Sequence, residues 1–134
     1  MNNIIILIVA MISGLATYTI STVLKKGTVF ASATVILVAG IIIPYFFNDF
    51  GSQLAGVAAC ASYAGMASTK VIPRLREMLA VSAIAGGIFV FTLHAYEGVG
   101  GRLGTIAAIS CFILLGMKKI LRRKELEEPN KVKI

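Results

Sequence analysis

The sequence predicts an all-α polytopic membrane protein, a bundle of five transmembrane helices. Its composition is the first reason: 57% of the 134 residues are hydrophobic and 14% are charged, whereas charged residues make up about a quarter of an ordinary soluble domain. The second reason is that five stretches without Asp, Glu, Lys or Arg follow one another, at residues 1–24, 27–48, 50–69, 78–96 and 103–117. Each is close to the length of about 20 apolar residues that a helix needs to cross a bilayer.

We expect the five helices at about 3–24, 28–47, 51–69, 78–96 and 103–121. The first stretch is long and has no basic residues before it, so we expect a retained helix and not a signal peptide. The second has Pro44 near its end, where the carbonyl that a proline frees lies close to water. The third and fifth are the shortest and the richest in Gly, Ala and Ser, and the fourth lies between the charged connector around Pro73 and Tyr96. Residues 1–124 then form one transmembrane domain, and 125–134 a polar cytoplasmic tail that is expected to be disordered.

The positive charges predict the orientation of the chain. Assigning alternate connectors to opposite sides gathers most cations on one side, namely Lys25, Lys26, Lys70, Arg74, Arg76 and the seven Lys and Arg residues after residue 117. Only Arg102 is left on the other side. By the positive-inside rule, the N-terminus is then outside and the C-terminus is cytoplasmic. A four-helix alternative, in which the first or the third stretch does not cross, scatters the cations over both faces.

Aromatic side chains mark the expected outer boundary of the membrane. Four of them cluster at the outer end of the second helix, Tyr45, Phe46, Phe47 and Phe50, and Tyr96 marks the outer end of the fourth. Aromatic belts of this kind lie at membrane–water interfaces. The expected location is a cell membrane crossed several times, with a bacterial or archaeal inner membrane favoured over an organelle, and the lipid bilayer is the first expected partner.

Charge distribution and cysteine usage exclude several classes of function. The formal net charge is +7, but the cations lie in short loops and a tail without interleaved aromatic residues, so no nucleic acid partner is expected. Cys60 and Cys111 lie inside apolar stretches without metal or disulfide spacing, and are expected to be small buried hydrophobic residues. The sequence offers no nucleophile–base pair, paired carboxylates or metal-spaced ligand set. Neither catalysis nor a cofactor is therefore expected.

Small and hydroxyl-bearing residues in the third and fifth helices point to a helix interface or a pathway. The third helix presents nearly a full face of Gly, Ala and Ser between residues 51 and 68, which lets another helix approach closely. Ser62, Tyr63, Gly65 and Ser110 are the residues that we expect at such an interface or along a polar pathway. The alternative for the hydroxyl groups is a hydrogen bond to their own helix or to a neighbouring helix of the bundle.

Two segments of the sequence resemble each other, residues 51–66 and 101–117. Both open with Gly, carry Leu and then an Ala pair, contain one Cys and finish with Gly-Met, although their alignment needs a one-residue gap. Both helices are expected to run from the outside to the inside. The similarity is therefore either a parallel repeat or the result of shared small-residue packing.

The connection before the fifth helix gathers unusual residues in the sequence HAYEGVGGRLGT, residues 94–105. Its four glycines allow a sharp turn, and the G-x-G-x-x-G nucleotide pattern fails because the third glycine is missing. Arg102 and Gly101 form a candidate contact for an anion at the outer face, unless Glu97 pairs with Arg102. His94 is either a candidate pH-sensitive residue or an ordinary interfacial one.

Two functions fit these features. The expected helices carry no charged residue at the membrane midplane, which argues against a proton- or cation-coupled transporter. The first function is a non-catalytic integral membrane subunit of a larger membrane assembly, held by small-residue helix faces. The alternative is a small homo-oligomeric permease or channel for a neutral or weakly polar solute. The expected protein partners are other membrane protein chains or copies of the chain itself.

Overall fold

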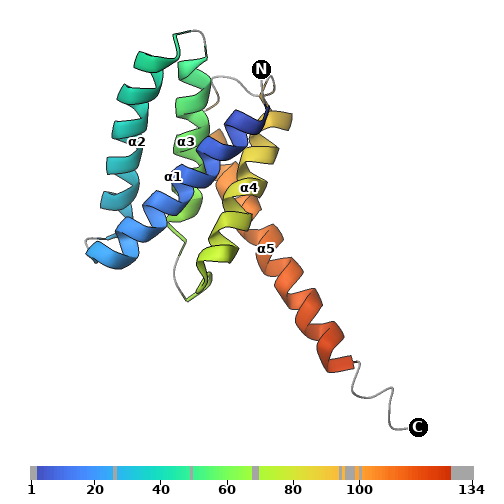
Figure 1. Ribbon diagram of the computed structural model, residues 1–134. Helices are drawn as coiled ribbons and strands as arrows, with labels where there is room; N and C mark the ends of the chain where they lie inside the picture. Colours follow the sequence, from blue (N-terminus) through green and yellow to red (C-terminus); the bar gives the residue numbers. More distant parts are fainter. Residues whose placement is uncertain are drawn as a thin grey trace.

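The structure, a computed structural model, describes residues 3–25, 27–48, 50–67, 70–93, 95, 99 and 101–127, with side chains up to Lys124. This part of the chain contains five helices: α1 (Asn3–Leu24), α2 (Thr28–Phe46), α3 (Gly51–Gly65), α4 (Leu75–Phe91) and α5 (Arg102–Glu127). Successive helices run in opposite directions, so the connections alternate between the two ends of the bundle, and α5 continues beyond it toward the C-terminus (Figure 1). The prediction of an all-helical chain with five helices is confirmed.

Three of the helices are long and apolar enough to cross a membrane: α1, α2 and the part Arg102–Lys124 of α5. α3 has 15 residues and α4 has 17, which correspond to about 22 Å and about 25 Å at a rise of about 1.5 Å per residue. The hydrocarbon core of a bilayer is about 30 Å thick. The three long helices indicate membrane association, whereas α3 and α4 are shorter than an isolated spanning helix.

The helix bounds differ from the expected ranges mainly at the charged connectors. α3 ends at Gly65 and not at residue 69, and α4 covers Leu75–Phe91 and not 78–96. The expected ranges followed the absence of charge, but α4 already begins after Arg74, whose extended backbone ends the connection. α5 continues to Glu127 because Lys, Arg, Leu and Glu are good helix formers and their charged groups can reach water.

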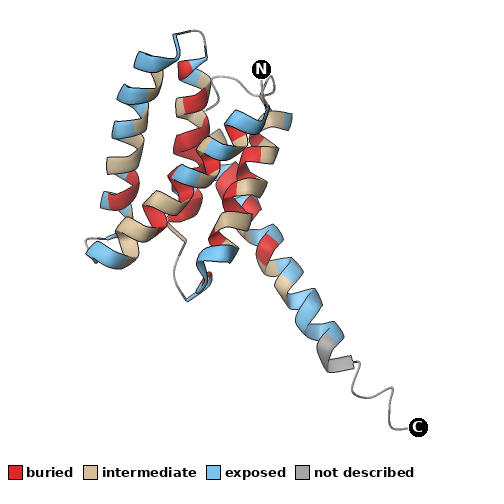
Figure 2. Cartoon of the chain, in the orientation of Figure 1, coloured by how far each residue is buried: buried red, intermediate tan, exposed pale blue. Residues whose placement is uncertain are grey.

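α3 is the centre of the bundle, since it packs against each of the other four helices. Among the described residues, no helix contact joins α2 to α4, α2 to α5 or α1 to α5. The buried positions of α3 are Gly51, Leu54, Val57, Ala58, Ala59, Cys60, Ala61, Ser62, Ala64 and Gly65, and Figure 2 shows buried residues along α3 and on the faces of α1 and α4. The small side chains of α3 let the other four helices pack closely around it.

Two glycines bring α1 close to α3 and α4. A Cβ at Gly65 would lie 2.8 Å from the backbone oxygen of Gly14 and 2.8 Å from Thr17 Cβ, both in α1. A Cβ at Gly14 would overlap the hydroxyl oxygen of Ser82 in α4 and lie 3.2 Å from the backbone oxygen of Ala61 in α3. α1 is therefore held closely between α3 and α4. The small residues at these crossings pack within the chain's own bundle.

Apolar side chains cover the outside of the long helices. Large hydrophobic residues are exposed along α1, α2 and α5, among them Ile8, Ile12, Leu37, Ile41, Phe112 and Ile113. In water this surface would be an unusually large exposed apolar patch. It suits the hydrocarbon interior of a bilayer, where apolar side chains need no cover.

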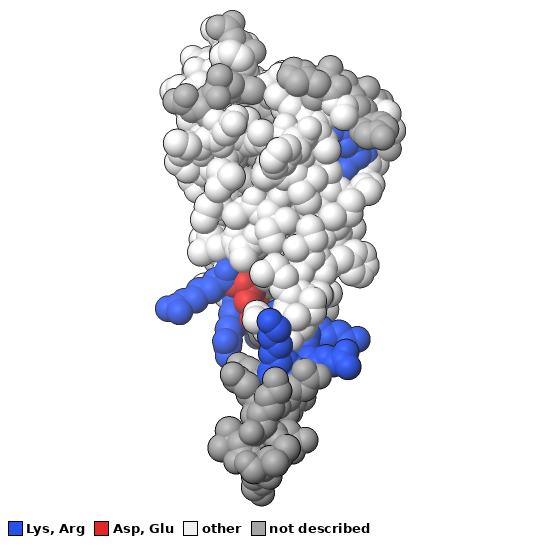
Figure 3. Space-filling model, turned by 90° about the vertical axis from the view of Figure 1, so that its right-hand side faces the viewer, with Lys and Arg blue, Asp and Glu red and all other residues white. Residues whose placement is uncertain are grey.

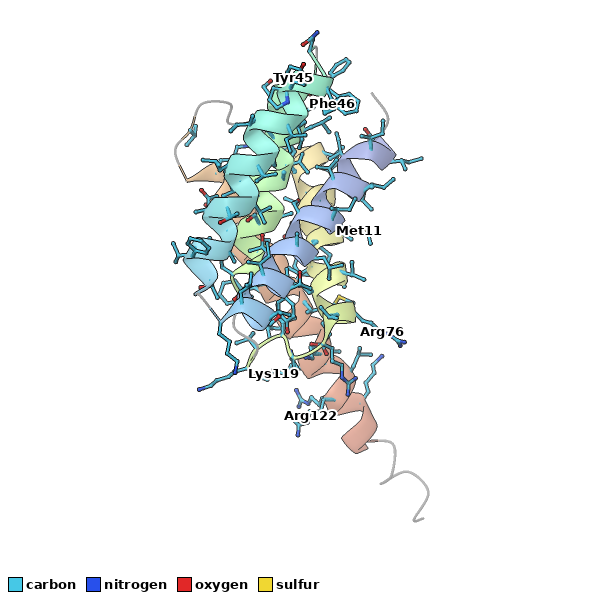
Figure 4. All side chains as sticks on the ribbon, turned by 60° about the vertical axis from the view of Figure 1, so that its left-hand side comes forward. Met11, Tyr45, Phe46, Arg76, Lys119 and Arg122 are labelled. Carbon is cyan, nitrogen blue, oxygen red and sulfur yellow. The ribbon has the colours of Figure 1, made fainter. Side chains whose placement is uncertain are left out.

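Most of the described charged residues lie at one end of the bundle, and a cluster of aromatic residues lies at the other. Arg76, Lys119 and Arg122 lie where α5 leaves the bundle, and Tyr45 and Phe46 lie at the other end (Figure 4). Figure 3 shows Lys and Arg side chains gathered below a broad uncharged surface. The basic end comprises Lys25, Lys70, Arg74, Arg76, Lys118, Lys119, Arg122, Arg123 and Lys124, and the aromatic end comprises Tyr45, Phe46, Phe47 and Phe50.

The two similar segments of the sequence lie in α3 and α5, which both run from the aromatic end to the basic end (Figure 1). Their corresponding glycines have different surroundings. Gly65 lies against the backbone of α1, whereas nothing lies within 4 Å of a Cβ built at Gly116. Whether the similarity reflects a repeat stays a hypothesis.

Candidate functional site

Ser62 lies at the junction of three helices. Its hydroxyl oxygen is 2.8 Å from Thr17 Oγ1 of α1 and 2.9 Å from Ser32 Oγ of α2, and all three side chains are buried. Thr17 donates to the backbone oxygen of Ser13 at 3.0 Å, so Ser62 can donate to Thr17 and Ser32 to Ser62. In this order every hydroxyl hydrogen has an acceptor. The cluster joins α1, α2 and α3 and leaves no donor directed toward a pathway.

The other predicted interface or pathway residues lie in different surroundings. Gly65 contacts Thr17 of α1, as Ser62 does. Tyr63 points away from that contact and is 39% exposed. Ser110 is buried and donates to the backbone oxygen of Ile106 in its own helix at 2.7 Å. The structure thus brings Ser62 and Gly65 together at α1, and places Tyr63 and Ser110 elsewhere.

Arg102 begins α5 at the aromatic end and reaches back to the end of α4. Its Nη2 donates to the backbone oxygen of Thr92, and also to that of Leu93 at 3.4 Å. Its guanidinium carbon lies 5.1 Å from the ring centroid of Phe89. Because the C-terminus of a helix carries partial negative charge, a cation there stabilises it. Gly101 precedes it with φ 83°, a conformation that glycine adopts without a steric penalty.

A hollow of about 300 Å³ lies beside Arg102, between the start of α3, the end of α4 and the start of α5. This aromatic-end hollow is lined by Ser52, Gln53, Gly56, Phe89, Leu93, Val99, Arg102 and Leu103. Two of these residues each have a buried polar atom, Gln53 Oε1 and Arg102 Nε, that has no hydrogen-bond partner among the described residues. Buried polar atoms without partners are costly, so the hollow is the strongest candidate binding site.

Gln53 was not among the residues expected from the sequence. It is the only glutamine of the chain and lies inside a charge-free stretch. A carboxamide needs several hydrogen bonds that lipid cannot supply, so its presence there is the signal that would have identified it. Phe89 carried no comparable signal, because a phenylalanine in an apolar helix is ordinary.

Two of the predicted site residues, His94 and Glu97, lie outside the described residues. The pH-sensing role of His94 therefore stays a prediction. The ion pair between Glu97 and Arg102 stays one as well.

The basic end has a wider hollow of about 670 Å³, lined by Pro73, Arg74, Glu77, Lys118, Lys119, Leu121 and Arg122. Lys118 Nζ lies 2.8 Å from Glu77 Oε2 in an ion pair that joins α5 to α4. The four cations outnumber this carboxylate. A partly exposed pair contributes little to stability, but the surplus charge attracts anionic lipid.

An apolar groove of about 400 Å³ lies between α1 and α2. The two helices meet at the basic end and diverge toward the aromatic end (Figure 1). Their facing side chains form its walls and Ala58 of α3 forms its floor. α2 is the least embedded helix, since Ala31 and Ser32 are its buried residues.

Comparison with known proteins finds no match among protein families, curated proteins or solved structures. Within the described part of the chain, no group of three or more His, Cys, Asp or Glu residues is placed to hold a metal ion. What the chain does has to follow from its own residues and their arrangement.

Proposed function

We propose that the chain is a non-catalytic integral membrane subunit of a larger membrane assembly. The observation that carries this proposal is the apolar groove between α1 and α2. Five of its twelve lining residues are small: Ser13, Ala16, Thr34, Ala39 and Ala58. Helices in lipid associate where small residues let their backbones approach, so we infer that a helix of a partner chain packs along this groove.

The interior of the bundle supports the same role. The Ser62 cluster satisfies its hydroxyl groups internally, and the closest glycine crossings already lie between the chain's own helices. What remains for a partner is the apolar outer surface together with the groove. The small-residue faces that the sequence suggested for assembly pack largely inside the bundle. The groove is therefore the surface that we assign to the partner.

A second candidate is the homo-oligomeric permease or channel for a neutral or weakly polar solute. The aromatic-end hollow favours it, because the polar residues Gln53 and Arg102 line it at one end of the bundle. The Ser62 cluster leaves no unused donor for a route through one copy. A pathway would therefore lie between copies of the chain.

Both roles include five membrane crossings with the N-terminus outside. The alternating connections and the separation of the basic end from the aromatic end support this topology. α3 and α4 cross in this proposal although they are short, because α3 is surrounded by protein and a short helix is accommodated by local thinning of the bilayer.

Cysteine labelling tests the five crossings. In a Cys60→Ala, Cys111→Ala background, we expect a membrane-impermeant maleimide to label Phe50→Cys in intact cells. Arg76→Cys and Lys124→Cys should react only after the membrane is permeabilised. If Phe50→Cys and Arg76→Cys react from the same side, α3 does not cross and the four-helix alternative replaces this topology.

Filling the groove tests the subunit role. Val38 lines the groove, whereas Ile41 on the same helix is 66% exposed and lies outside the lining. We expect Val38→Trp to remove a stoichiometric partner chain from particles purified in mild detergent, measured by native mass spectrometry. Ile41→Trp is the matched control and should retain it.

The outcomes separate the two candidates. If the particle contains only copies of this chain and Val38→Trp breaks it into monomers, the permease or channel becomes the better proposal and solute flux in vesicles is the next measurement. If both tryptophan variants keep the same partners, the groove is not the interface and the proposal fails at its central observation.

A further inference from the structure

The aromatic-end hollow combines an unpaired acceptor with an unpaired donor. Gln53 Oε1 needs a hydroxyl or N–H group, and the Nε–H of Arg102 needs an oxygen. The two residues line the same 300 Å³ space. A single ligand that carries a hydroxyl group and an acidic oxygen satisfies both, and the space is at the lower end of the range for small-molecule sites.

The charge of Arg102 favours an anion there. The C-terminus of α4, which the guanidinium contacts through Thr92 and Leu93, is equivalent to about half a negative charge. About half of the positive charge then has no balancing charge among the described residues. Glu77, the one acidic residue whose side chain the structure describes, lies at the basic end.

A second groove, of about 320 Å³, also begins at Arg102 and Val99 and follows α4 and α5. Its other lining residues are Ile88, Thr92, Thr105, Ile106 and Ile109. The hydroxyls of Thr92 and Thr105 donate to backbone oxygens of Ile88 and Gly101, so the groove offers an apolar wall. An acyl chain fits such a wall, below a headgroup held by Arg102.

We propose that the aromatic-end hollow binds the headgroup of an anionic phospholipid that carries a free hydroxyl. Its phosphodiester lies at Arg102, its hydroxyl donates to Gln53 Oε1, and one acyl chain follows the groove between α4 and α5. Phosphatidylglycerol has this chemistry. A soluble glycerol phosphate shares the headgroup chemistry but has no acyl chain for the groove.

The test uses the full chain in phosphatidylcholine nanodiscs that contain either phosphatidylglycerol or phosphatidylmethanol. These two lipids have the same charge, but only the first has a headgroup hydroxyl. Native mass spectrometry then counts the anionic lipid retained after transfer to detergent. We expect the wild-type chain to retain phosphatidylglycerol in preference to phosphatidylmethanol.

The variants separate a built site from general attraction to cations. Gln53→Leu changes no charge, and its lost hydrogen bond should lower phosphatidylglycerol retention several-fold, to about tenfold at most, and remove the preference over phosphatidylmethanol. Gly56→Leu fills the hollow, since a Cβ at Gly56 already lies 3.4 Å from Phe89 Cζ, and should act in the same way. Lys124→Gln removes a cation at the basic end and should leave the preference unchanged.

Three results would overturn the proposal. Equal retention of the two lipids by the wild-type chain would mean that no hydroxyl is recognised. Displacement of phosphatidylglycerol by soluble glycerol 3-phosphate at equal concentration would assign the hollow to a solute and not to a lipid. Retention that appears only in Glu97→Gln would show that Glu97 is the anion at Arg102.

Discussion

Replacement of Gly65 by leucine is expected to prevent α1 from packing on α3, so that the chain inserts in the membrane but does not form a stable bundle. A Cβ at this position would lie 2.8 Å from the backbone oxygen of Gly14, and a backbone atom cannot move aside as a flexible side chain does. α1 cannot shift either, because Gly14 also lies against Ser82 of α4. A large loss of stability should therefore arise at this crossing.

Gly65→Ala is expected to destabilise the same crossing, but less than Gly65→Leu does. Overpacking a close crossing costs about 1–3 kcal/mol, and the higher helix propensity of alanine returns up to about 1 kcal/mol. We expect a net loss, measured as a lower temperature at which the protein in mild detergent loses its monodisperse gel-filtration peak. Gly65→Leu should have no such peak at any temperature.

Gly87 and Gly40 are the matched controls, because nothing lies within 4 Å of a Cβ built at either position. Gly87→Ala and Gly40→Ala should keep or raise the transition temperature. Equal stability of Gly65→Ala and Gly87→Ala would show that α1 and α3 do not cross as closely as the glycine geometry implies.

The sequence predicted the membrane class and the five helices because both depend on composition and on the spacing of charges. It did not predict where α3 and α4 end. Charge-free stretches show where a chain can enter lipid, whereas the helix ends depend on local backbone features such as the extended Arg74. The length of a helix and the length of an apolar stretch are different quantities. They differ at α3, where the charge-free stretch continues to residue 69 but the helix ends at Gly65.

The candidate site was predictable only in part. Arg102 was identifiable because it is the single cation expected on its side of the membrane. Its contact with the end of α4 depends on how two helix ends meet, and the sequence does not encode that contact as a motif. Ser62 and Tyr63 are neighbours in sequence, but one is buried at a three-helix junction and the other is exposed, because adjacent residues of a helix point in different directions.

Removal of the Arg102 guanidinium, in Arg102→Met, is the second large effect that we expect. Hydrogen bonds from a charged donor contribute about 1.5–3 kcal/mol, and a cation at a helix C-terminus contributes up to about 2 kcal/mol in a partly buried position. These two contributions overlap, so a total loss of about 2–3 kcal/mol is expected. The loss should be local first, because the guanidinium contacts the backbone oxygens of Thr92 and Leu93.

Hydrogen exchange at the end of α4 measures this loss directly. The amides of Thr92 and Leu93 donate to the backbone oxygens of Ile88 and Val90, and they should exchange faster in Arg102→Met while the middle of α4 is unchanged. Arg102→Lys keeps the charge but loses the guanidinium that contacts Phe89, so it should fall between the wild-type chain and Arg102→Met. Lys124→Met removes a cation at the basic end and should leave these amides unaffected. If exchange at Thr92 and Leu93 is the same in all four proteins, Arg102 does not stabilise the end of α4, and its charge at the aromatic end would then have to be explained by a ligand or by Glu97 alone.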